Sequence, residues 1–439
     1  MRLPKPPQPW PRDPPPGPFR DAFWKSPLRG AWLTSLLGSA LLPLITICAV
    51  TGFLSHLAYH PELGDNSVFG QRGILGIDFY WIGYPANPAW IYAFTQGTHI
   101  ATGLAAIPIL IAKLWSVMPR LFEWPPLRSP AHSIERLSLL MLVGGSIFVF
   151  LSGLWNIQNW YPWPFNFVAS HYFGAIIFLA GLGFHLVVKL PVALREFRSR
   201  GLVRPLRASL AETEPERHQP GSLAPADPAP ATISRRGLIA TIAAGSGLAA
   251  LMGIGQSLGG PLRDLALLGP RGRGNSGDGT NDFPVNKTFA ISGIEQAATG
   301  PGWRVRLLGG SGLELSREQL LAMPQTSASL PIACVEGWSS TQEWSGVRLA
   351  DLASAVGLDS PGQTLVESLQ LEGSFRQATL SSGQAADSRT ILALKVNGAD
   401  LSADHGFPAR VVAPAVPGLH CTKWVGSISF NQGGGDEPA

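Results

Sequence analysis

Cysteine and charge are both scarce in this 439-residue sequence, and each shortage excludes a class of protein. The three cysteines, Cys48, Cys334 and Cys421, are too few and too scattered for a disulfide framework or a metal site made only of cysteine. Charged residues make up 14% of the chain, the net charge is +4, and the basic residues form no nucleic-acid patch. Any cysteine chemistry therefore uses a single sulfur atom, and nucleic acid is excluded as a partner.

Long apolar runs fill the first half of the chain instead. Four strongly apolar spans are each long enough to cross a hydrocarbon layer of roughly 30 Å, which takes about 20 helical residues. A fifth, weaker span is rich in small residues. We place the five spans near 32–57, 91–117, 136–157, 166–190 and 237–260. The sequence therefore predicts a multi-pass protein of the cell membrane.

The basic residues lie beside these spans, on one side of the predicted membrane. They occur in the Pro-rich segment 1–29, in the loop with Arg120 and Arg128, and from Arg195 to Arg207 after the fourth span. Since loops rich in Lys and Arg stay in the cytoplasm, we expect a cytoplasmic amino terminus and an extracytoplasmic carboxy-terminal part. The composition of 1–29 predicts a disordered tail.

Composition divides the chain into six regions. Residues 208–233 are rich in Ala, Pro and Glu, and residues 261–282 are rich in Gly, as flexible connectors are. The predicted order is a cytoplasmic tail (1–29), a four-helix transmembrane domain (30–207), a cytoplasmic linker (208–233), a fifth transmembrane helix (234–260), a tether (261–282) and an extracytoplasmic domain (283–432).

The last region has the pattern of a compact α+β domain, in which short alternating runs are broken by Gly and Pro turns. Strands are predicted at 288–292, 303–309, 391–398 and 409–415. Helix-like stretches lie at 316–322 and 348–356. The predicted fold class is thus multi-domain, with a helical membrane part followed by an α+β domain.

Histidines inside the apolar spans are candidate functional residues, because an ionisable residue in a membrane is costly unless it is paired or liganded. His171 and His185 lie 14 residues apart on one span, so they share a helix face and are separated by about 21 Å along the axis. His99 lies on the second span at the depth of His171. Facing helices of a bundle can supply two imidazole ligands to a haem iron. We therefore predict that His99 and His171 bind one haem and that His185 binds haem iron at the opposite level.

The number of haems stays open at this point. Counting 14 residues onward from His99 gives Lys113 and not a histidine, so His185 lacks an obvious partner. Lys113 and His132 are weak candidates for that position. Each of these histidines could instead have a hydrogen-bonded packing role.

Two further histidines, His56 and His60, lie at the end of the first span. They are candidates for binding the haem iron, a haem propionate or a quinone. Residues 30–190 resemble the bacterial membrane cytochrome b subunits that serve hydrogenases and formate dehydrogenases. The resemblance implies an all-α four-helix haem bundle that holds one or two haems b and exchanges electrons with quinone in the lipid membrane.

The segment "TISRRGLIATIAAGSG" at 232–247 looks like a twin-arginine export signal, in which Arg235 and Arg236 precede a mildly apolar stretch. Such a signal suits a domain that must cross the membrane already folded around a cofactor. The alternative is that the two arginines only hold the cytoplasmic end of the fifth span.

Cys334 follows the strand-like run "LPIA" and begins a turn, where a thiol can reach a bound group. A soft sulfur ligand suits a transition metal, but one cysteine cannot complete a zinc or iron–sulfur site. A dithiolene cofactor would supply the remaining ligands. The alternative is an inert buried thiol.

Residues 283–430 resemble the molybdopterin-binding domain of the sulfite oxidase superfamily, and "CVEGW" at 334–338 is similar to the metal-binding segment of bacterial protein-methionine-sulfoxide reductase. The resemblance implies that Cys334 is the catalytic molybdenum ligand. The run "DHGFPARVVAPAVPGLHCTKWVGSISF" at 404–430 resembles the family's pterin phosphate clamp. The positions that it implies for cofactor binding are His405, Arg410, Cys421, Thr422 and Lys423.

Some positions depart from the sulfite oxidase pattern. Val335, Glu336 and Gly337 stand where those enzymes carry arginines for an oxyanion, and Phe375 replaces a tyrosine of many relatives. No immunoglobulin-like dimerisation domain follows, so a monomer is expected. Two tryptophans, at 338 and 344, either line the site or belong to the core.

Together these features predict an oxidoreductase with Mo-molybdopterin and haem b, which takes electrons from quinone to reduce a small or protein-bound S- or N-oxide. Two alternatives are a dehydrogenase of a sulfite-like substrate that delivers electrons to quinone, and a non-catalytic haem redox sensor.

Overall fold

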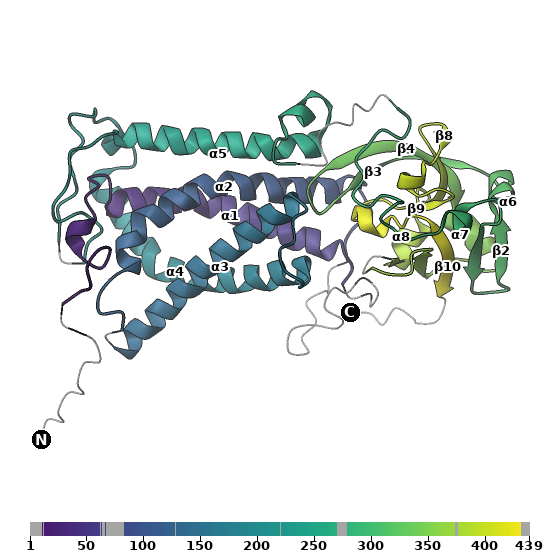
Figure 1. Ribbon diagram of the computed structural model, residues 1–439, viewed down its shortest axis with the longest axis horizontal. Coiled ribbons are helices and arrows are strands. Elements are labelled where there is room, and N and C mark those ends of the chain that lie inside the picture. Colours follow the sequence, from purple (N-terminus) through teal and green to yellow (C-terminus); the bar gives the residue numbers. More distant parts are fainter. Residues whose placement is uncertain are drawn as a thin grey trace, which may run out of the picture. The chain divides into compact units, whose positions relative to one another are not determined.

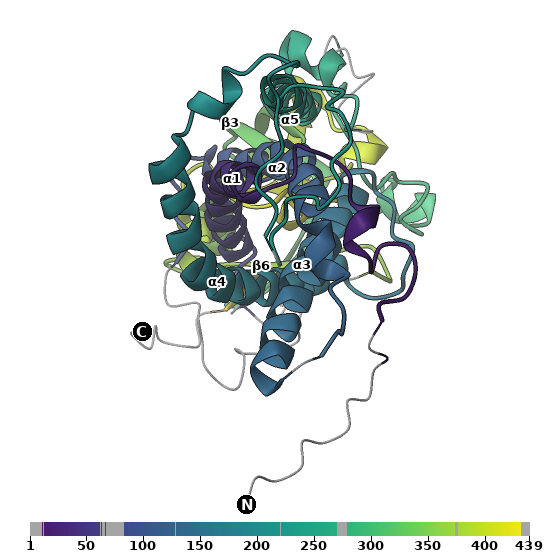
Figure 2. The same cartoon turned by 90° about the vertical axis from the view of Figure 1, so that its left-hand side faces the viewer.

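The computed structural model describes residues 11, 13–61, 63, 66, 83–127, 129–219, 221–269, 279–373 and 376–431. Five helices in these ranges are long and apolar enough to cross a membrane, which confirms the five predicted spans (Figures 1 and 2). They are α1 (Ala31–Leu57), α2 (Ile91–Leu121), α3 (Pro130–Ile157), α4 (Phe167–Arg200) and α5 (Arg235–Leu258). The end of α4 lies ten residues beyond the predicted 190, because the sequence up to Arg200 is rich in Ala, Leu, Glu and Arg, which favour helix.

The chain divides into two compact units, and the first comprises the described residues of Met1–Ile47, Thr102–Leu154 and Ser170–Ala250. Its core joins α1, α2 and α4 through residues such as Trp32, Leu37, Ala106 and Phe178. The predicted tail (1–29) and the predicted linker (208–233) both contain described residues that pack more closely than their composition predicts. In the amino-terminal segment Trp24 and Leu28 are buried.

Glu216 lies in the predicted flexible linker 208–233, yet it contacts the start of α1. Its carboxylate accepts hydrogen bonds from the backbone N–H groups of Ala31 and Trp32 at 2.9 and 3.2 Å. Arg200 lies 3.5 Å from the same carboxylate. Free N–H groups at a helix amino terminus favour a negative partner, so the linker caps α1.

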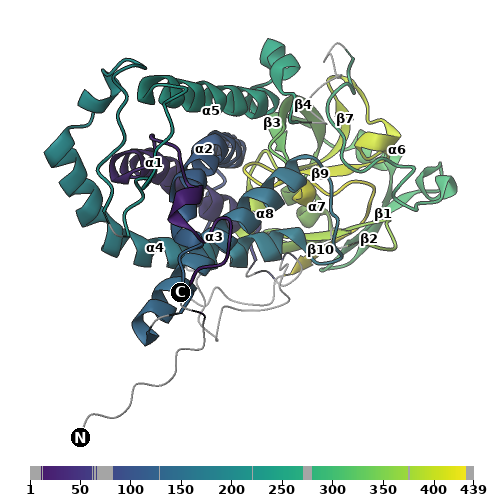
Figure 3. The same cartoon turned by 60° about the vertical axis from the view of Figure 1, so that its left-hand side comes forward.

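The second unit comprises the described residues of Cys48–Ala101, Trp155–Ala169 and Leu251–Ala439. It holds the carboxy-terminal ends of α1, α3 and α5 and the amino-terminal ends of α2 and α4. The short helices α6 (Arg317–Ala322), α7 (Leu349–Ala355) and α8 (Ser382–Ala386) lie in the same unit. It also holds two five-stranded sheets (Figure 3).

The first sheet has the order β2-β1-β10-β5-β6, and only the pair β1 and β10 is parallel. Its strands are β1 (Arg304–Leu308), β2 (Leu313–Ser316), β5 (Gln363–Ser368), β6 (Gln377–Leu380) and β10 (Val425–Asn431). The second sheet is antiparallel, has the order β3-β4-β7-β8, and adds β9 beside β7. Its strands are β3 (Thr326–Ala333), β4 (Ser339–Arg348), β7 (Ile391–Val396), β8 (Ala399–Asp400) and β9 (Arg410–Val412).

One core packs the sheets together and includes the buried side chains of Trp303, Leu330, Trp344 and Leu392. The predicted helices at 316–322 and 348–356 and the strands at 303–309, 391–398 and 409–415 are confirmed, with shifted ends. The strand predicted at 288–292 is wrong, since this segment forms turns. The backbone N–H of Phe289 donates to Asp404 Oδ1 at 2.7 Å, a side-chain bond that takes the place of a strand partner.

Candidate functional site

Cys334 lies in the tight turn between the antiparallel strands β3 and β4. Its backbone N–H donates to Trp338 O at 2.9 Å, and Gly337 N–H donates to Cys334 O at 3.0 Å. Gly337 has φ +96°, a conformation that strains any residue with a Cβ. The strand predicted before Cys334 is confirmed, and the turn fixes the thiol at the end of that strand.

Asn286 contacts the Cys334 thiol and was not predicted as a site residue. Its Nδ2 donates to Cys334 Sγ and to Glu336 Oε2, both at 2.8 Å, and its Oδ1 accepts from Trp338 Nε1 at 2.9 Å. Burial and the Glu336 carboxyl raise the pKa of the Cys334 thiol well above its usual range. These surroundings disfavour a free thiolate nucleophile at Cys334.

The main chain that follows Cys334 is held by ends of the long helices. The carbonyl of Val335 accepts hydrogen bonds from Gln96 of α2 at 2.7 Å and from Asn156 of α3 at 3.3 Å. The next two carbonyls, of Glu336 and Gly337, accept hydrogen bonds from Gln256 and Ser257 of α5 at 2.8 and 2.5 Å. The cysteine turn and these helix ends therefore form one structural element of the second unit.

The three side chains predicted to hold a phosphate, His405, Arg410 and Lys423, lie around Gly406. A Cβ on Gly406, whose φ is +111°, would lie only 3.1 Å from the Lys423 Cβ and 3.2 Å from the Arg410 Cβ. Glycine is therefore needed at this position for the two cationic side chains to come together. Arg410 is buried, and its Nε donates to the carbonyl of Cys421 at 3.1 Å.

His405 is held in one orientation. Its Nε2 bonds to the Asn281 carbonyl at 2.9 Å, and its ring stacks on Phe283 with centroids 3.6 Å apart. Burial and the charges of Arg410 and Lys423 lower the pKa of His405 to about 3. His405 is therefore a neutral imidazole, and Arg410 and Lys423 supply the positive charge.

The charges at this position fit a bound phosphate. Within the described ranges neither Arg410 nor Lys423 forms an ion pair with a carboxylate. Burial and Arg410 lower the pKa of Lys423 to about 7, as expected for cations without a counter-charge. The buried hydroxyl of Thr422 also lacks a hydrogen-bond partner in this part of the chain. Two cations and a free hydroxyl are the groups that a phosphate would satisfy.

Trp338, Trp344 and Cys421 belong to the core of the second unit. Trp344 also lies under the Arg410 guanidinium, 5.5 Å from the ring centroid. The tryptophans thus belong to the core, which was one of the two predicted alternatives, and a role in lining the site stays a prediction. Position 375 and Arg128 lie outside the described residues.

The predicted haem ligands are spread over both units. His99 lies in the second unit, with its Nδ1 2.8 Å from the carbonyl of Cys48, and His171 lies in the first, with its Nδ1 2.9 Å from Ser152 Oγ. His56 is buried at the end of α1, and His185 lies on α4. Haem ligation by these residues stays a prediction.

Lys113, the weak candidate beside His185, donates from Nζ to the carbonyl of Thr34 at 2.5 Å. This hydrogen bond uses one of the three N–H donors of the ammonium group. No cluster of three or more His, Cys, Asp or Glu side chains arranged to hold a metal ion occurs in the described ranges.

The fold and this site define a molybdopterin-binding oxidoreductase. The family model named oxidoreductase molybdopterin-binding domain matches residues 294–436 of this chain. An uncharacterised oxidoreductase of Bacillus subtilis, YuiH, is 30% identical over 156 residues, which cover 35% of this chain and 76% of YuiH. The chain therefore belongs to the oxidoreductase molybdopterin-binding family.

Mitochondrial sulfite oxidase of Mus musculus is 31% identical over 147 residues, which cover 28% of this chain and 27% of that protein. The chain thus spans about a quarter of the length of such sulfite oxidases. The structure of the sulfane dehydrogenase SoxCD from Paracoccus pantotrophus aligns at 24% identity with a TM-score of 0.27, covering 30% of this chain and 38% of that one. We draw no argument from that alignment.

Proposed function

We propose that this chain is a membrane-bound oxidoreductase in which a haem b domain takes electrons from quinol and a Mo-molybdopterin site reduces an S- or N-oxide. The observation that carries the proposal is the combination of a single fixed sulfur, Cys334, with the Arg410 and Lys423 clamp in one compact unit. When bound, the cofactor supplies two-electron oxygen-atom chemistry. Cys334 would bind the molybdenum.

The remaining residues of the site would orient the cofactor. His405, Arg410 and Lys423 would hold the phosphate, and the backbone of Cys421 and Thr422 would lie beside the pterin. A planar guanidinium and a compact ammonium are complementary ways to bind phosphate oxygens.

The environment of two histidines supports the haem proposal. A histidine whose Nδ1–H donates to an oxygen presents its Nε2 lone pair to a metal, and both His99 and His171 have an oxygen beside Nδ1. A glycine of the neighbouring helix also lies beside each ring. A Cβ on Gly52 would lie 2.8 Å from His99, and one on Gly153 would lie 3.4 Å from His171. We propose that these two histidines bind one haem, that His185 binds a second, and that His56 is a less favoured ligand.

The helix ends in the second unit support the proposed orientation. If the amino terminus is cytoplasmic, then the carboxy-terminal ends of α1, α3 and α5 and the amino-terminal ends of α2 and α4 are extracytoplasmic. All five of these ends lie in the unit that contains Cys334. Arg235, of the twin-arginine motif, is buried at the start of α5 and donates to Glu214 O at 2.6 Å. This contact is compatible with a retained anchor, and its use as an export signal is a proposal.

Quinol supplies the electrons and protons that the proposed reaction consumes. An oxide R₂SO and a quinol QH₂ give R₂S, Q and water, so that two electrons and two protons pass from the quinol to the departing oxygen. The buried Glu336 carboxyl, joined to the Cys334 thiol through Asn286, disfavours an anion at this position. A neutral oxide therefore suits the site better than sulfite. The similarity of "CVEGW" to protein-methionine-sulfoxide reductase agrees with this choice.

A dehydrogenase that passes electrons from a sulfite-like substrate to quinone is the second candidate, because it is favoured by the similarity to sulfite oxidases. Purified protein is first assayed for molybdenum and haem. The haem is then reduced with quinol under anaerobic conditions, and sulfoxides and N-oxides are added. Reoxidation of the haem bands supports the reductase, whereas haem reduction by sulfite with no reoxidation by any oxide supports the dehydrogenase.

Replacement of the metal ligand separates the two halves of the proposal. Cys334→Ser should abolish oxide-dependent reoxidation and leave the haem spectrum unchanged. Full activity of this variant would refute Cys334 as the molybdenum ligand. The Cys48→Ser variant, which keeps Cys334, should still reduce the oxide.

A further inference from the structure

Three buried polar side chains meet beside the cysteine turn, and none of them was predicted as a site residue. Tyr59 follows α1, Tyr92 lies in the first turn of α2, and His420 precedes the clamp residue Cys421. The Tyr59 ring meets the Tyr92 ring edge to face at 6.4 Å and the His420 ring edge to face at 5.8 Å, between centroids. Tyr59 is 3% exposed, and Tyr92 and His420 are each 1% exposed.

The polar atoms of this Tyr59–Tyr92–His420 cluster are only partly satisfied by the protein. Neither ring nitrogen of His420 has a hydrogen-bond partner among the described residues, and each tyrosine hydroxyl has only the other tyrosine beside it as a partner. Buried polar groups nearly always have partners, because leaving them unpaired is costly. Two unpartnered ring nitrogens, beside a tyrosine pair that keeps one O–H free to donate, indicate that a polar ligand completes the cluster.

The cluster lies next to Cys334. Tyr59 and Tyr92 pack with Ala333, the residue before the cysteine, and with Val335, the residue after it. The turn that carries His420 approaches the same strand end, since a Cβ on Gly418 would lie 3.0 Å from the carbonyl of Ala333. The Cys334 and Glu336 side chains add to burial in raising the pKa of Tyr59.

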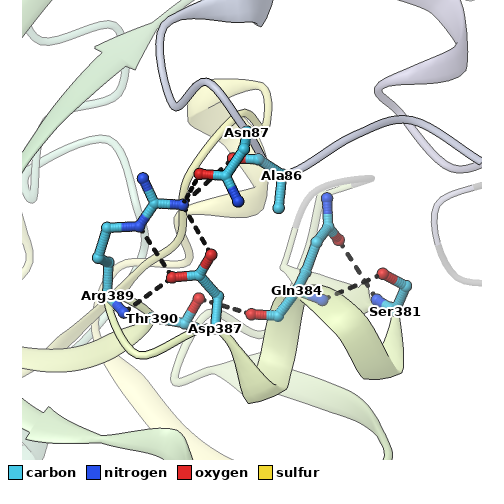
Figure 4. A network of polar contacts seen from close by, with 7 residues as sticks. All are labelled: Ala86, Asn87, Ser381, Gln384, Asp387, Arg389 and Thr390. Carbon is cyan, nitrogen blue, oxygen red and sulfur yellow. Dashed lines mark hydrogen bonds and ion pairs between the residues drawn. The ribbon is translucent and has the colours of Figure 1, made fainter.

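Contacts elsewhere in the unit hold the two tyrosines in place. The segment that leads into α2 is tied by Arg389, whose Nη2 donates to Asn87 Oδ1 at 2.7 Å while Asp387 pairs with the same guanidinium (Figure 4). After Tyr59, Asn66 exchanges two hydrogen bonds with the backbone of Thr379, at 2.7 and 3.0 Å. These hydrogen bonds therefore fix the chain segments next to Tyr59 and Tyr92.

All the donors of the cluster are neutral. Tyrosine hydroxyls donate hydrogen bonds without carrying charge. Burial and the charge of His60 lower the pKa of His420 to about 3, so its ring is neutral and has one N–H donor. Neutral donors suit the partly negative oxygen of an S=O or N–O group, and without a cation beside them they stabilise a full negative charge less well.

We propose that the Tyr59–Tyr92–His420 cluster binds the oxygen of a neutral S- or N-oxide beside Cys334. The ends of two membrane helices thereby supply part of the substrate site and select a neutral oxide against an anion. This proposal rests on the proposed function and adds the substrate class and the residues that recognise it.

The test is a calorimetric titration of the full-length holoenzyme with dimethyl sulfone, a neutral stand-in with two S=O oxygens, and with sulfate as the anionic probe. Wild-type protein should bind the sulfone at least tenfold more tightly than sulfate. Tyr59→Phe keeps the ring and removes one hydroxyl, so sulfone affinity should fall about five- to tenfold, as for the loss of one hydrogen bond. Sulfate binding that equals sulfone binding would overturn the proposal.

Two matched variants separate binding from folding. Tyr84→Phe removes a buried hydroxyl that already bonds to Thr95 at 3.2 Å, and it should leave sulfone affinity unchanged. His420→Leu should abolish sulfone binding, and His420→Gln, which keeps an N–H donor, should restore most of it. An equal loss in the Tyr84 variant would show a packing effect and overturn the proposal.

Turnover measurements distinguish this proposal from the proposed function. Tyr59→Phe should raise KM for a neutral sulfoxide and leave KM for quinol and the haem spectrum unchanged. A rise in KM for quinol instead would assign the cluster to a quinone and overturn the inference. If wild-type protein reduces no oxide, the proposed function fails, and the sulfone titration still decides what the cluster binds.

Discussion

Replacement of Asn286 by Leu should change the electronic environment of the proposed molybdenum site with little change in its shape, because the two side chains have the same branching and the same number of heavy atoms. Leu removes the N–H group that donates to Cys334 Sγ at 2.8 Å, and it leaves Trp338 Nε1 without its acceptor. Hydrogen bonds to charged groups contribute about 1.5–3 kcal/mol. A bond to the sulfur stabilises the electron-rich, reduced state most.

If about 1 kcal/mol of that bond is specific to the reduced state, the midpoint potential of a one-electron molybdenum couple falls by about 40 mV, since 59 mV corresponds to a tenfold change. A redox titration followed by electron paramagnetic resonance measures this shift in Asn286→Leu and wild type. The control is Asn281→Leu, which removes two side-chain hydrogen bonds away from the sulfur, one donated to Asp400 O and one accepted from the Ser402 N–H. An unchanged potential in Asn286→Leu would refute an electronic role for this residue.

Three further predictions concern the linker, the clamp and the second haem. Glu216→Ala removes the cap of α1 and should lower the free energy of unfolding by about 1–2 kcal/mol in thermal unfolding of detergent-solubilised protein, whereas Glu214→Ala, an exposed neighbour, should have no effect. Because burial lowers the pKa of Lys423 from 10.5 to about 7, the unfolded chain binds a proton that the folded one lacks between these values, so cofactor-free protein should become more stable as pH rises from 7 to 10.5. Lys423→Met should flatten that slope, and an unaltered slope would contradict the assignment. His185→Leu should reduce the haem content from two to one per chain, while unchanged content would leave His185 a packing role.

The five long helices were predictable because about 20 consecutive apolar residues have few alternatives to a membrane-spanning helix. The end of α4 could not be predicted in this way, because the charged sequence up to Arg200 favours helix but is not an apolar run. The short strands were harder still. The run at 288–292 has the residue types of a strand, yet Asp404, more than a hundred positions away, bonds to its backbone and keeps it in turns.

The site could be predicted only where a segment resembles that of a known family. Cys334, Arg410 and Lys423 were predicted because "CVEGW" and the run at 404–430 resemble the family's cysteine segment and phosphate clamp. Asn286 was missed because an asparagine in a loop is usually a turn residue, and only the fold brings it to the sulfur. The Tyr59–Tyr92–His420 cluster could not be found either, because its members lie on three separate segments.

The contacts of segment 335–337 with the helix ends have a consequence for sequence change in this protein. Gln96, Asn156, Gln256 and Ser257 all donate to main-chain oxygens of that segment and to none of its side chains. Substitutions at 335 or 336 would therefore leave these four attachments in place. Such an arrangement lets new side chains be tried next to Cys334 while the main chain around it keeps its geometry.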